Sequence, residues 1–200
     1  MVTEKQRWPR LVAMGVAIAI EVELSLFCKR IAIAGSLRRK KESVGDIEVL
    51  FVGNTATRSD KADMFASVEV NLADEAIATL EKKGVLERRK NVNGIETYGP
   101  KNKLMRHVVS GIPVDFFSTM EPCWMVALVI RTGSKETNLK LTTGAIRLGR
   151  RLHAYGEGVS ILEPQIIDGV AYNRGDVIKA RNERDVFELC GVKYLEPEQR

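Results

Sequence analysis

Cysteine is scarce in this chain of 200 residues, and its placement excludes two kinds of site. The three cysteines, Cys28, Cys123 and Cys190, are far apart and include no Cys-x-x-Cys pair. Structural zinc sites and disulfide frameworks need closer or evenly paired cysteines, so we expect reduced thiols in an intracellular protein. Neither His107 nor His153 has metal-ligand neighbours in the sequence, and we expect His107 to be structural.

A long hydrophobic run is also missing. The apolar run near the N-terminus, residues 11–20, is shorter than the roughly 20 residues that span a bilayer, and Glu21 and Glu23 follow it closely. No small-residue cleavage site follows the run, which argues against a signal peptide. Repeats and low-complexity tracts are absent as well. The sequence therefore predicts no membrane association.

The net positive charge of the chain suits an acidic partner. The net charge is +5 and the isoelectric point is near 9.2, which fits nucleic acid without establishing it. The hydrophobic fraction of 44% is normal for a globular chain. A chain of this length can form one ordinary domain or two small ones.

The first 120 residues are predicted to be mostly strands, with helices at their edges. The expected helices are 9–27 and 72–83, the second capped by Asn71 and ended by Gly84. Asn93-Gly94 is a strong hairpin signal, and the polar residues 53–65 are predicted to form a loop. The expected strands are 30–34, 46–52, 85–90, 95–98, 104–109 and 112–117.

The composition changes at Glu121-Pro122. Residues 123–152 have a helical period that Gly133-Ser134 breaks into two helices. Short strands and turns follow, and a closing helix over 183–190 is expected to end at Gly191. We predict an α+β fold with one domain over 1–120 and a smaller one over 121–200.

The chemistry is concentrated in residues 35–50, which read GSLRRKKESVGDIEVL. The Gly35-Ser36 turn follows a strand and opens a short basic helix, so its backbone N–H groups can bind an anion such as a phosphate. Asp46 and Glu48 are two residues apart on the next strand and point to the same face. Two carboxylates on one face repel each other unless a cation lies between them, and Mg²⁺ prefers such oxygen ligands.

A third carboxylate, Asp115, lies in the apolar segment Pro-Val-Asp-Phe-Phe. A carboxylate in such a strand needs a partner. If this strand lies beside the strand of Asp46, then Asp46, Glu48 and Asp115 share a face in the arrangement of a two-metal site. The alternative is an aspartate on an edge strand that faces water.

Gly-Ser-Leu-Arg-Arg, six further residues and Gly-Asp-Ile-Glu together resemble the palm motif of family X DNA polymerases, the polymerase beta-like nucleotidyltransferases. The family pattern is Gly-Ser-x-Arg-Arg followed by Gly-Asp-x-Asp, and the family has its third acid on a strand like that of Asp115. The resemblance implies a nucleotidyltransferase palm with a mixed, mostly antiparallel sheet and flanking helices, followed by a thumb of helices and a β-hairpin. Glu48 departs from the pattern by one methylene, so we expect a shifted site that is slower or more tolerant of Mn²⁺.

The resemblance also implies roles for these residues. Asp46 and Glu48 would hold one Mg²⁺ or Mn²⁺ on the triphosphate, and all three acids would share a second ion. Asp115 would accept the proton of the primer 3′-hydroxyl. The expected nucleotide-binding residues of the first motif are Gly35, Ser36, Arg39 and Gly45. Arg38 is left open between a structural role and a surface cation.

A second nucleotide-binding segment contains Thr132-Gly133-Ser134 and Asn138. It resembles the family segment Tyr-Phe-Thr-Gly-Ser with an Asn four residues later, which contacts the sugar and base. Gly133 suits the bend of that segment, and Asn138 resembles the residue at the minor-groove edge of the nucleotide. Ile130 and Arg131 replace the aromatic pair, which leaves the choice between deoxynucleotides and ribonucleotides open.

Two groups of basic residues are candidates for nucleic-acid contacts. Lys101, Lys103 and Arg106 are predicted to bind template or primer phosphates. Arg147, Arg150 and Arg151 are expected on a helix of the second domain, where a solvated face explains them as well.

We therefore expect an enzyme that adds deoxynucleotides to a DNA 3′-hydroxyl on a primer-template or gapped duplex, with two Mg²⁺ or Mn²⁺ ions and a nucleoside triphosphate. We expect a monomer and, without an obvious lysine nucleophile module, no lyase activity. One alternative is a nucleotidyltransferase with another acceptor: template-independent, RNA or a small molecule. Another is a non-catalytic nucleic-acid-binding relative.

Overall fold

The computed structural model describes residues 6–59 and 67–200. Contacts divide the chain into two compact units, which are described separately below. The first unit contains Met1–Ile33 and Lys41–Ser118, and the second contains Ala34–Lys40 and Thr119–Arg200. Nothing in the sequence predicted that Ala34–Lys40 would pack with the later residues.

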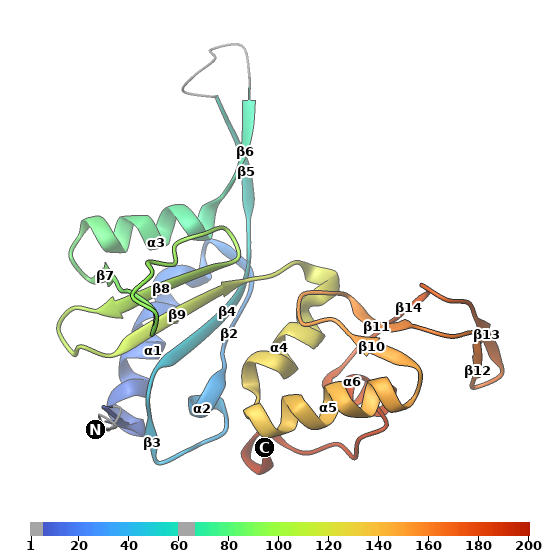
Figure 1. Cartoon of the computed structure of the whole chain (residues 1–200). Helices are drawn as coiled ribbons and strands as arrows, with labels where there is room; N and C mark the ends of the chain where they lie inside the picture. The colour runs from blue at the N-terminus through green and yellow to red at the C-terminus, as the bar shows by residue number, and fades with distance from the viewer. Residues whose placement is uncertain (1–5, 60–66) are drawn as a thin grey trace. The chain divides into compact units, whose positions relative to one another are not determined.

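The first unit is built on a five-stranded sheet (Figure 1). Its strand order is β2-β4-β9-β8-β7, and only the β4–β9 pair is parallel. The sheet is thus mixed and mostly antiparallel, as expected. The strands are β2 (Cys28–Ile33), β4 (Ile47–Gly53), β7 (Leu86–Arg88), β8 (Asn102–His107) and β9 (Pro113–Ser118).

Two helices pack on this sheet, and both were predicted. Helix α1 (Arg10–Ser25) packs against β2 and β4, and α3 (Leu72–Lys82) packs against α1, β4 and β7. Asn71 caps α3 by accepting hydrogen bonds from the backbone N–H groups of Ala73 and Asp74. The helix ends before Gly84, whose φ of +72° lies in the region that favours glycine.

The predicted loop over 53–65 is wrong in its first half. Strand β5 (Thr55–Ser59) pairs antiparallel with β6 (Ser67–Asn71), and the two form a separate ribbon that extends beyond the sheet (Figure 1). Most of its side chains are exposed, so its sequence is polar and resembles a loop. Residues 60–65 of the prediction lie outside the described residues.

Two further differences concern short pairings. β1 (Trp8–Pro9) pairs with β3 (Ser43–Val44), which was not predicted. The described residues 95–98 form no strand, and only the bridges Lys90↔Glu96 and Tyr98↔Lys103 join them to neighbouring segments.

The second unit has a helical core that supports a small sheet. Helices α4 (Trp124–Thr132) and α5 (Lys135–Arg147) meet at Gly133-Ser134, and α6 (Glu183–Leu189) closes the unit before Gly191, as predicted. Val126, Val129, Leu141, Val186 and Phe187 belong to the buried core. The other elements are α2 (Gly35–Arg38), η1 (Glu121–Cys123), β10 (Arg150–Leu152), β11 (Gly158–Ile161), β12 (Gln165–Ile167), β13 (Val170–Tyr172), β14 (Val177–Lys179) and η2 (Pro197–Gln199).

The sheet β10-β11-β14 corrects one prediction. Arg150 and Arg151 lie on β10 and not on a helix, because α5 ends at Arg147. Gly149, with a φ of +65°, makes the turn between them.

Across the part of the chain that the structure describes, no helix has both the length and the apolar character needed to span a bilayer.

Candidate active site

The register of β4 and β9 brings two of the predicted carboxylates to neighbouring positions. Glu48 on β4 is paired with Asp115 on β9, and the two strands are parallel. Residues paired across adjacent strands point to the same face of a sheet. Asp46 directly precedes β4, two residues before Glu48. The backbone therefore supports the prediction that these acids share one face.

Asp115 has a partner that the sequence analysis missed. Only 9% of the residue is exposed, and its carboxylate forms an ion pair with the guanidinium of Arg89. Arg89 follows β7, and its backbone N–H donates to the carbonyl of Leu104 (3.1 Å), which is the β8 neighbour of Asp115. Arg89, Leu104, Asp115 and Glu48 thus form one row across the sheet.

The carboxylates are not gathered as a metal cluster in this arrangement. Over residues 6–59 and 67–200, no group of three or more Asp, Glu, His or Cys side chains is close enough to hold a metal ion. The donor set itself fits Mg²⁺, because all three candidates are carboxylates on one face of adjoining segments. For all three to act as ligands, Asp115 must exchange Arg89 for the metal. Asp46, Glu48 and Asp115 therefore stay a predicted metal site.

In the second unit, α2 presents a hydroxyl that suits an anion. Gly35 has a φ of +61°, which favours glycine at this turn. The Oγ of Ser36 is buried and has no hydrogen-bond partner among the described residues. A buried hydroxyl normally has a partner, so this one fits a missing phosphate oxygen. Because α2 is a single turn, its dipole adds little, and the side chains of the segment matter more.

Arg38 has a structural role, which settles an alternative that the sequence left open. It forms an ion pair with Glu183 and donates to Thr132 Oγ1 (2.6 Å). Arg200 forms a second ion pair with Glu183 (2.8 Å). Burial raises the pKa of the Glu183 carboxyl, but the two guanidinium groups outweigh it, and the pKa is below its ordinary value. This network attaches α2 to α4, α6 and the C-terminal segment.

The segment after α4 gathers the other nucleotide-binding candidates of this unit. Gly133 has a φ of +54°, and the Gly133–Ser134 peptide bond is cis. A Cβ at Gly133 would lie 3.6 Å from both Arg39 Nη1 and Asn138 Nδ2. Arg39 donates to the carbonyl of Thr132. Arg39, Gly133 and Asn138 therefore lie close together.

Hydrogen bonds fix the two polar side chains of this segment. Ser134 caps α5 by accepting from the N–H of Thr137 (3.3 Å). Asn138 Nδ2 donates to the carbonyl of Ile130 (2.8 Å), whereas its buried Oδ1 has no hydrogen-bond partner in the described residues. An oriented amide with an unused acceptor is suited to reading a hydrogen-bond donor on a ligand.

The replacement for the family's aromatic pair is also held in place. Arg131 donates a hydrogen bond to the hydroxyl of Tyr155, and its guanidinium lies 5.4 Å from the centre of that ring. Arg131, which replaces an aromatic residue of the family's sequence motif, thus contacts the phenol of a different segment.

One predicted DNA contact is wrong. Lys103 is only 4% exposed, and its ammonium bonds to Asp74 (2.7 Å) and to the carbonyl of Gly99 (3.1 Å). This buried ion pair makes Lys103 structural. Lys101 and Arg106 are both exposed, and Arg106 pairs with Glu87 at 3.5 Å, so both stay predicted phosphate contacts. Gly45 is buried beside the Asp46 strand and also stays a prediction.

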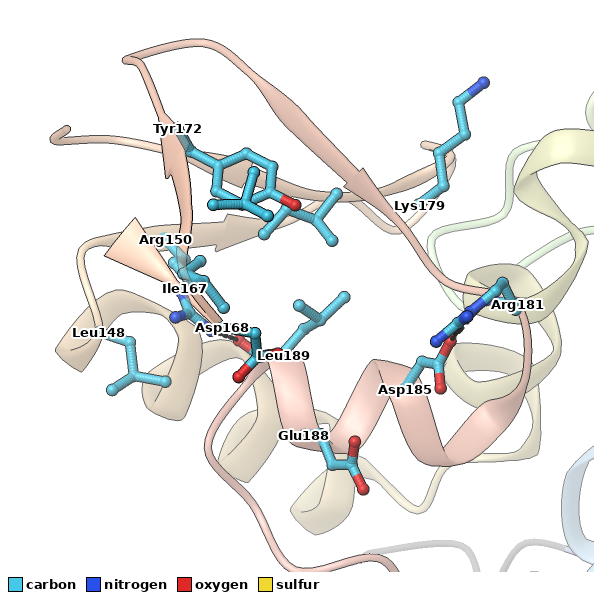
Figure 2. A pocket seen from close by; sticks show the side chains of 12 residues that line it. Leu148, Arg150, Ile167, Asp168, Tyr172, Lys179, Arg181, Asp185, Glu188 and Leu189 are labelled. Carbon is cyan, nitrogen blue, oxygen red and sulfur yellow. Dashed lines mark hydrogen bonds and ion pairs between the residues drawn. The ribbon is translucent and has the colours of Figure 1, made fainter. Parts of the chain in front are cut away.

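A cavity of about 580 Å³ lies elsewhere in the second unit, between the β12–β13 hairpin, β14 and α6 (Figure 2). Its charged side chains are mostly engaged: Arg150 bonds to Gln165 and the carbonyl of Leu189, and Arg181 pairs with Asp185. None of the predicted catalytic, metal-binding or nucleotide-binding residues lines it.

The chain resembles known proteins in sequence. Residues 127–200 match the family model described as DNA polymerase beta thumb. The chain is 25% identical to DNA polymerase lambda of Rattus norvegicus over 201 aligned residues, which cover 97% of this chain. It spans 33% of the length of that relative.

The fold is shared with a solved structure. The crystal structure of Leishmania infantum polymerase beta, a ternary P/T complex, matches with a TM-score of 0.72 and 19% identity, over 98% of this chain and 77% of the other. The chain is therefore similar to family X polymerases in the sequence of its second unit, and it shares the α+β fold of a polymerase beta.

Proposed function

We propose that this chain is a nucleotidyltransferase that adds deoxynucleotides to a DNA 3′-hydroxyl, as in gap filling. The observation that carries the proposal is the pairing of Glu48 with Asp115 on adjacent parallel strands, with Asp46 directly before the first. Three carboxylates in this order suit the transfer of a phosphoryl group between two oxygens.

The chain's own residues would divide the work as follows. Asp46, Glu48 and Asp115 would hold two Mg²⁺ or Mn²⁺ ions, which when bound neutralise the triphosphate and lower the pKa of the primer hydroxyl. Asp115 would accept the proton of the primer hydroxyl while the hydroxyl oxygen attacks the α-phosphorus and pyrophosphate leaves.

Two kinds of observation support the proposed nucleotide-binding residues. Ser36 Oγ and Asn138 Oδ1 are buried without a hydrogen-bond partner in the described residues, and Arg39 and Asn138 lie beside Gly133. The buried Ser36 hydroxyl and the Arg39 guanidinium would bind phosphate oxygens, with Arg39 supplying a planar pair of donors. Gly133, Ser134 and Asn138 would bind the sugar and base, and the buried Oδ1 of Asn138 would accept one hydrogen bond.

Two specific observations favour other functions. The Arg131–Tyr155 pair differs from the family's aromatic pair and favours a ribonucleotide or a different acceptor. The Arg89–Asp115 ion pair favours a relative that binds nucleic acid without catalysis.

Extension of a labelled primer in Mg²⁺ and in Mn²⁺ tests the proposal. We expect the wild-type chain to extend the primer, and Asp46→Asn and Asp115→Asn to lose roughly 1,000-fold in rate. Glu69→Gln is the matched control, because Glu69 is an exposed acid on β6, and it should keep full activity. Full activity in the Asp46→Asn, Asp115→Asn double variant would exclude the proposed mechanism.

The same assay separates the alternatives. Incorporation of ribonucleotides as efficiently as deoxynucleotides would favour a nucleotidyltransferase with another acceptor. Extension of a single strand without a template would favour the same alternative. A wild-type chain that binds gapped DNA but transfers no nucleotide in either metal would favour the non-catalytic relative.

A further inference from the structure

One face of α1 is apolar and exposed, although the opposite face already fills the core. Ala13, Ala17, Ile20 and Leu24 are buried against the sheet. The outer side of the helix presents Leu11, Val12, Ile18 and Val22, and Leu26 follows directly as the C-cap residue; Leu11 is 81% exposed and Leu26 83% exposed. A surface helix normally carries polar residues on its outer face, and contiguous apolar patches of this kind mark interaction sites.

Gly15 on the same face is an independent sign of a close neighbour. It lies in the middle of α1, where glycine weakens a helix relative to alanine. A Cβ at Gly15 would meet nothing within 4 Å. Nothing in the described part of this chain therefore requires a glycine there, whereas a second helix that packs against α1 would.

We propose, in place of the monomer expected from the sequence, that α1 is a dimerisation helix that packs antiparallel against α1 of a second copy of this chain. The outer face is self-complementary about a point between Ile18 and Ala19. A twofold axis there sets Leu11 against Leu26, Gly15 against Val22, and Ile18 against Ala19 of the other copy. Each small residue then faces a large one, as close packing of helices requires.

The charges of α1 favour the same orientation. The helix has no acidic residue in its first turn and no basic residue in its last, so its own side chains do not offset its dipole. Its N-terminal end carries Arg10, and Glu21 and Glu23 lie near its C-terminal end. Antiparallel pairing places each end beside the opposite charge and the opposite dipole end of the other copy.

The area is sufficient for a weak, specific dimer. Complete burial of these apolar side chains in both copies would remove at most on the order of 1,000 Å² from water, which is near the lower limit for a biological interface. Interfaces near this lower limit are weak, so we expect association only at high protein concentration. The inference is independent of the proposed catalytic function, because an inactive chain would dimerise equally.

Sedimentation of the full chain over about 1–200 µM tests the proposal. We expect wild type to dimerise in this range and Val22→Glu to weaken the dimer at least about 100-fold, because the carboxylate would be buried. Val109→Glu is the matched control: Val109 is 89% exposed, lies in the turn between β8 and β9, and should not change association. Unchanged circular dichroism of both variants excludes unfolding as the cause.

A charge-exchange experiment tests the antiparallel register. Leu11→Glu and Leu26→Lys should each weaken the dimer, and the double variant should recover at least about tenfold, because each new carboxylate faces a new ammonium. A wild-type chain that stays monomeric at about 200 µM, or a dimer that Val22→Glu leaves unchanged, would overturn the proposal. A double variant no tighter than the single ones would overturn the antiparallel pairing.

Discussion

Replacing Arg89 with leucine tests how the ion pair on Asp115 is related to metal binding. The two side chains are 19% and 13% exposed, so their charges are largely withdrawn from water. Removing one partner of a buried ion pair leaves the other charge without compensation, which costs about 3–5 kcal/mol when burial is complete. With the remaining exposure, we expect Arg89→Leu to lower the free energy of unfolding by about 2–3 kcal/mol in the absence of divalent ions.

Divalent ions should reverse this loss if Asp115 is a metal ligand. In the wild-type chain a metal must compete with Arg89 for the carboxylate, whereas in Arg89→Leu it meets no competitor. Relief of about 2 kcal/mol corresponds to roughly 30-fold tighter binding of Mg²⁺ or Mn²⁺. Saturating Mg²⁺ should then restore most of the lost stability, because the ion stabilises the folded state to which it binds.

Urea unfolding of both proteins with EDTA and over a series of Mg²⁺ concentrations measures these quantities. Arg88→Leu is the matched control, because the neighbouring Arg88 pairs with Glu81 and Glu96 at a more exposed position and away from Asp115. It should change stability far less and leave metal affinity as in wild type. If Arg89→Leu is destabilised equally with EDTA and with Mg²⁺, then Asp115 does not bind the metal and the reasoning fails.

Further predictions concern the ion pairs of Glu183 with Arg38 and Arg200, and the ion pair of Lys103 with Asp74. Glu183→Gln should lower stability by about 3 kcal/mol, measured by urea unfolding, because Arg38 and the buried Arg200 lose their shared carboxylate. The folded-state pKa of Glu183 is below its ordinary 4.5. Its contribution to the free energy of unfolding is therefore present above about pH 4.5 and is lost as the pH falls through the lowered pKa. The wild-type chain should show this loss of stability, and Glu183→Gln should not. Lys103→Met should lower stability but leave the salt dependence of DNA affinity unchanged, since Lys103 pairs with Asp74, whereas loss of a true phosphate contact would reduce the salt slope by about one.

Local signals in the sequence were sufficient for much of the fold. The cap at Asn71, the break at Gly133-Ser134 and the end at Gly191 each rest on the conformation of one or two residues, and each is found. The antiparallel pairing of β8 with β9 was also predictable, because alternating residues flank a short turn.

Features that depend on distant contacts were not predictable. The β5–β6 ribbon buries few side chains, so it has no alternation of apolar residues to reveal it. Arg150 and Arg151 continue the helical period of the preceding residues in the sequence, so a helix was predicted there. In the structure Gly149 has a positive φ, and the chain changes from helix α5 to strand β10.

The candidate site also combines features that local sequence predicts with one that depends on a distant contact. The candidate carboxylates could be proposed because their order and spacing are local, and the structure pairs Glu48 with Asp115 through the sheet register. Arg89 could not be found, because it reaches Asp115 across β8. The sequence contains the run Arg88-Arg89-Lys90. No local signal distinguishes Arg89, which pairs with Asp115, from Arg88, which is more exposed.

Extension of a duplex with a one-nucleotide gap, with each nucleotide supplied separately, tests the central claim most directly. The account predicts that the chain inserts the deoxynucleotide that pairs with the template base, in Mg²⁺ or Mn²⁺, and that Asp46→Asn reduces this insertion roughly 1,000-fold. No insertion of any nucleotide in either metal, or equal insertion by the Asp46→Asn protein, would contradict it.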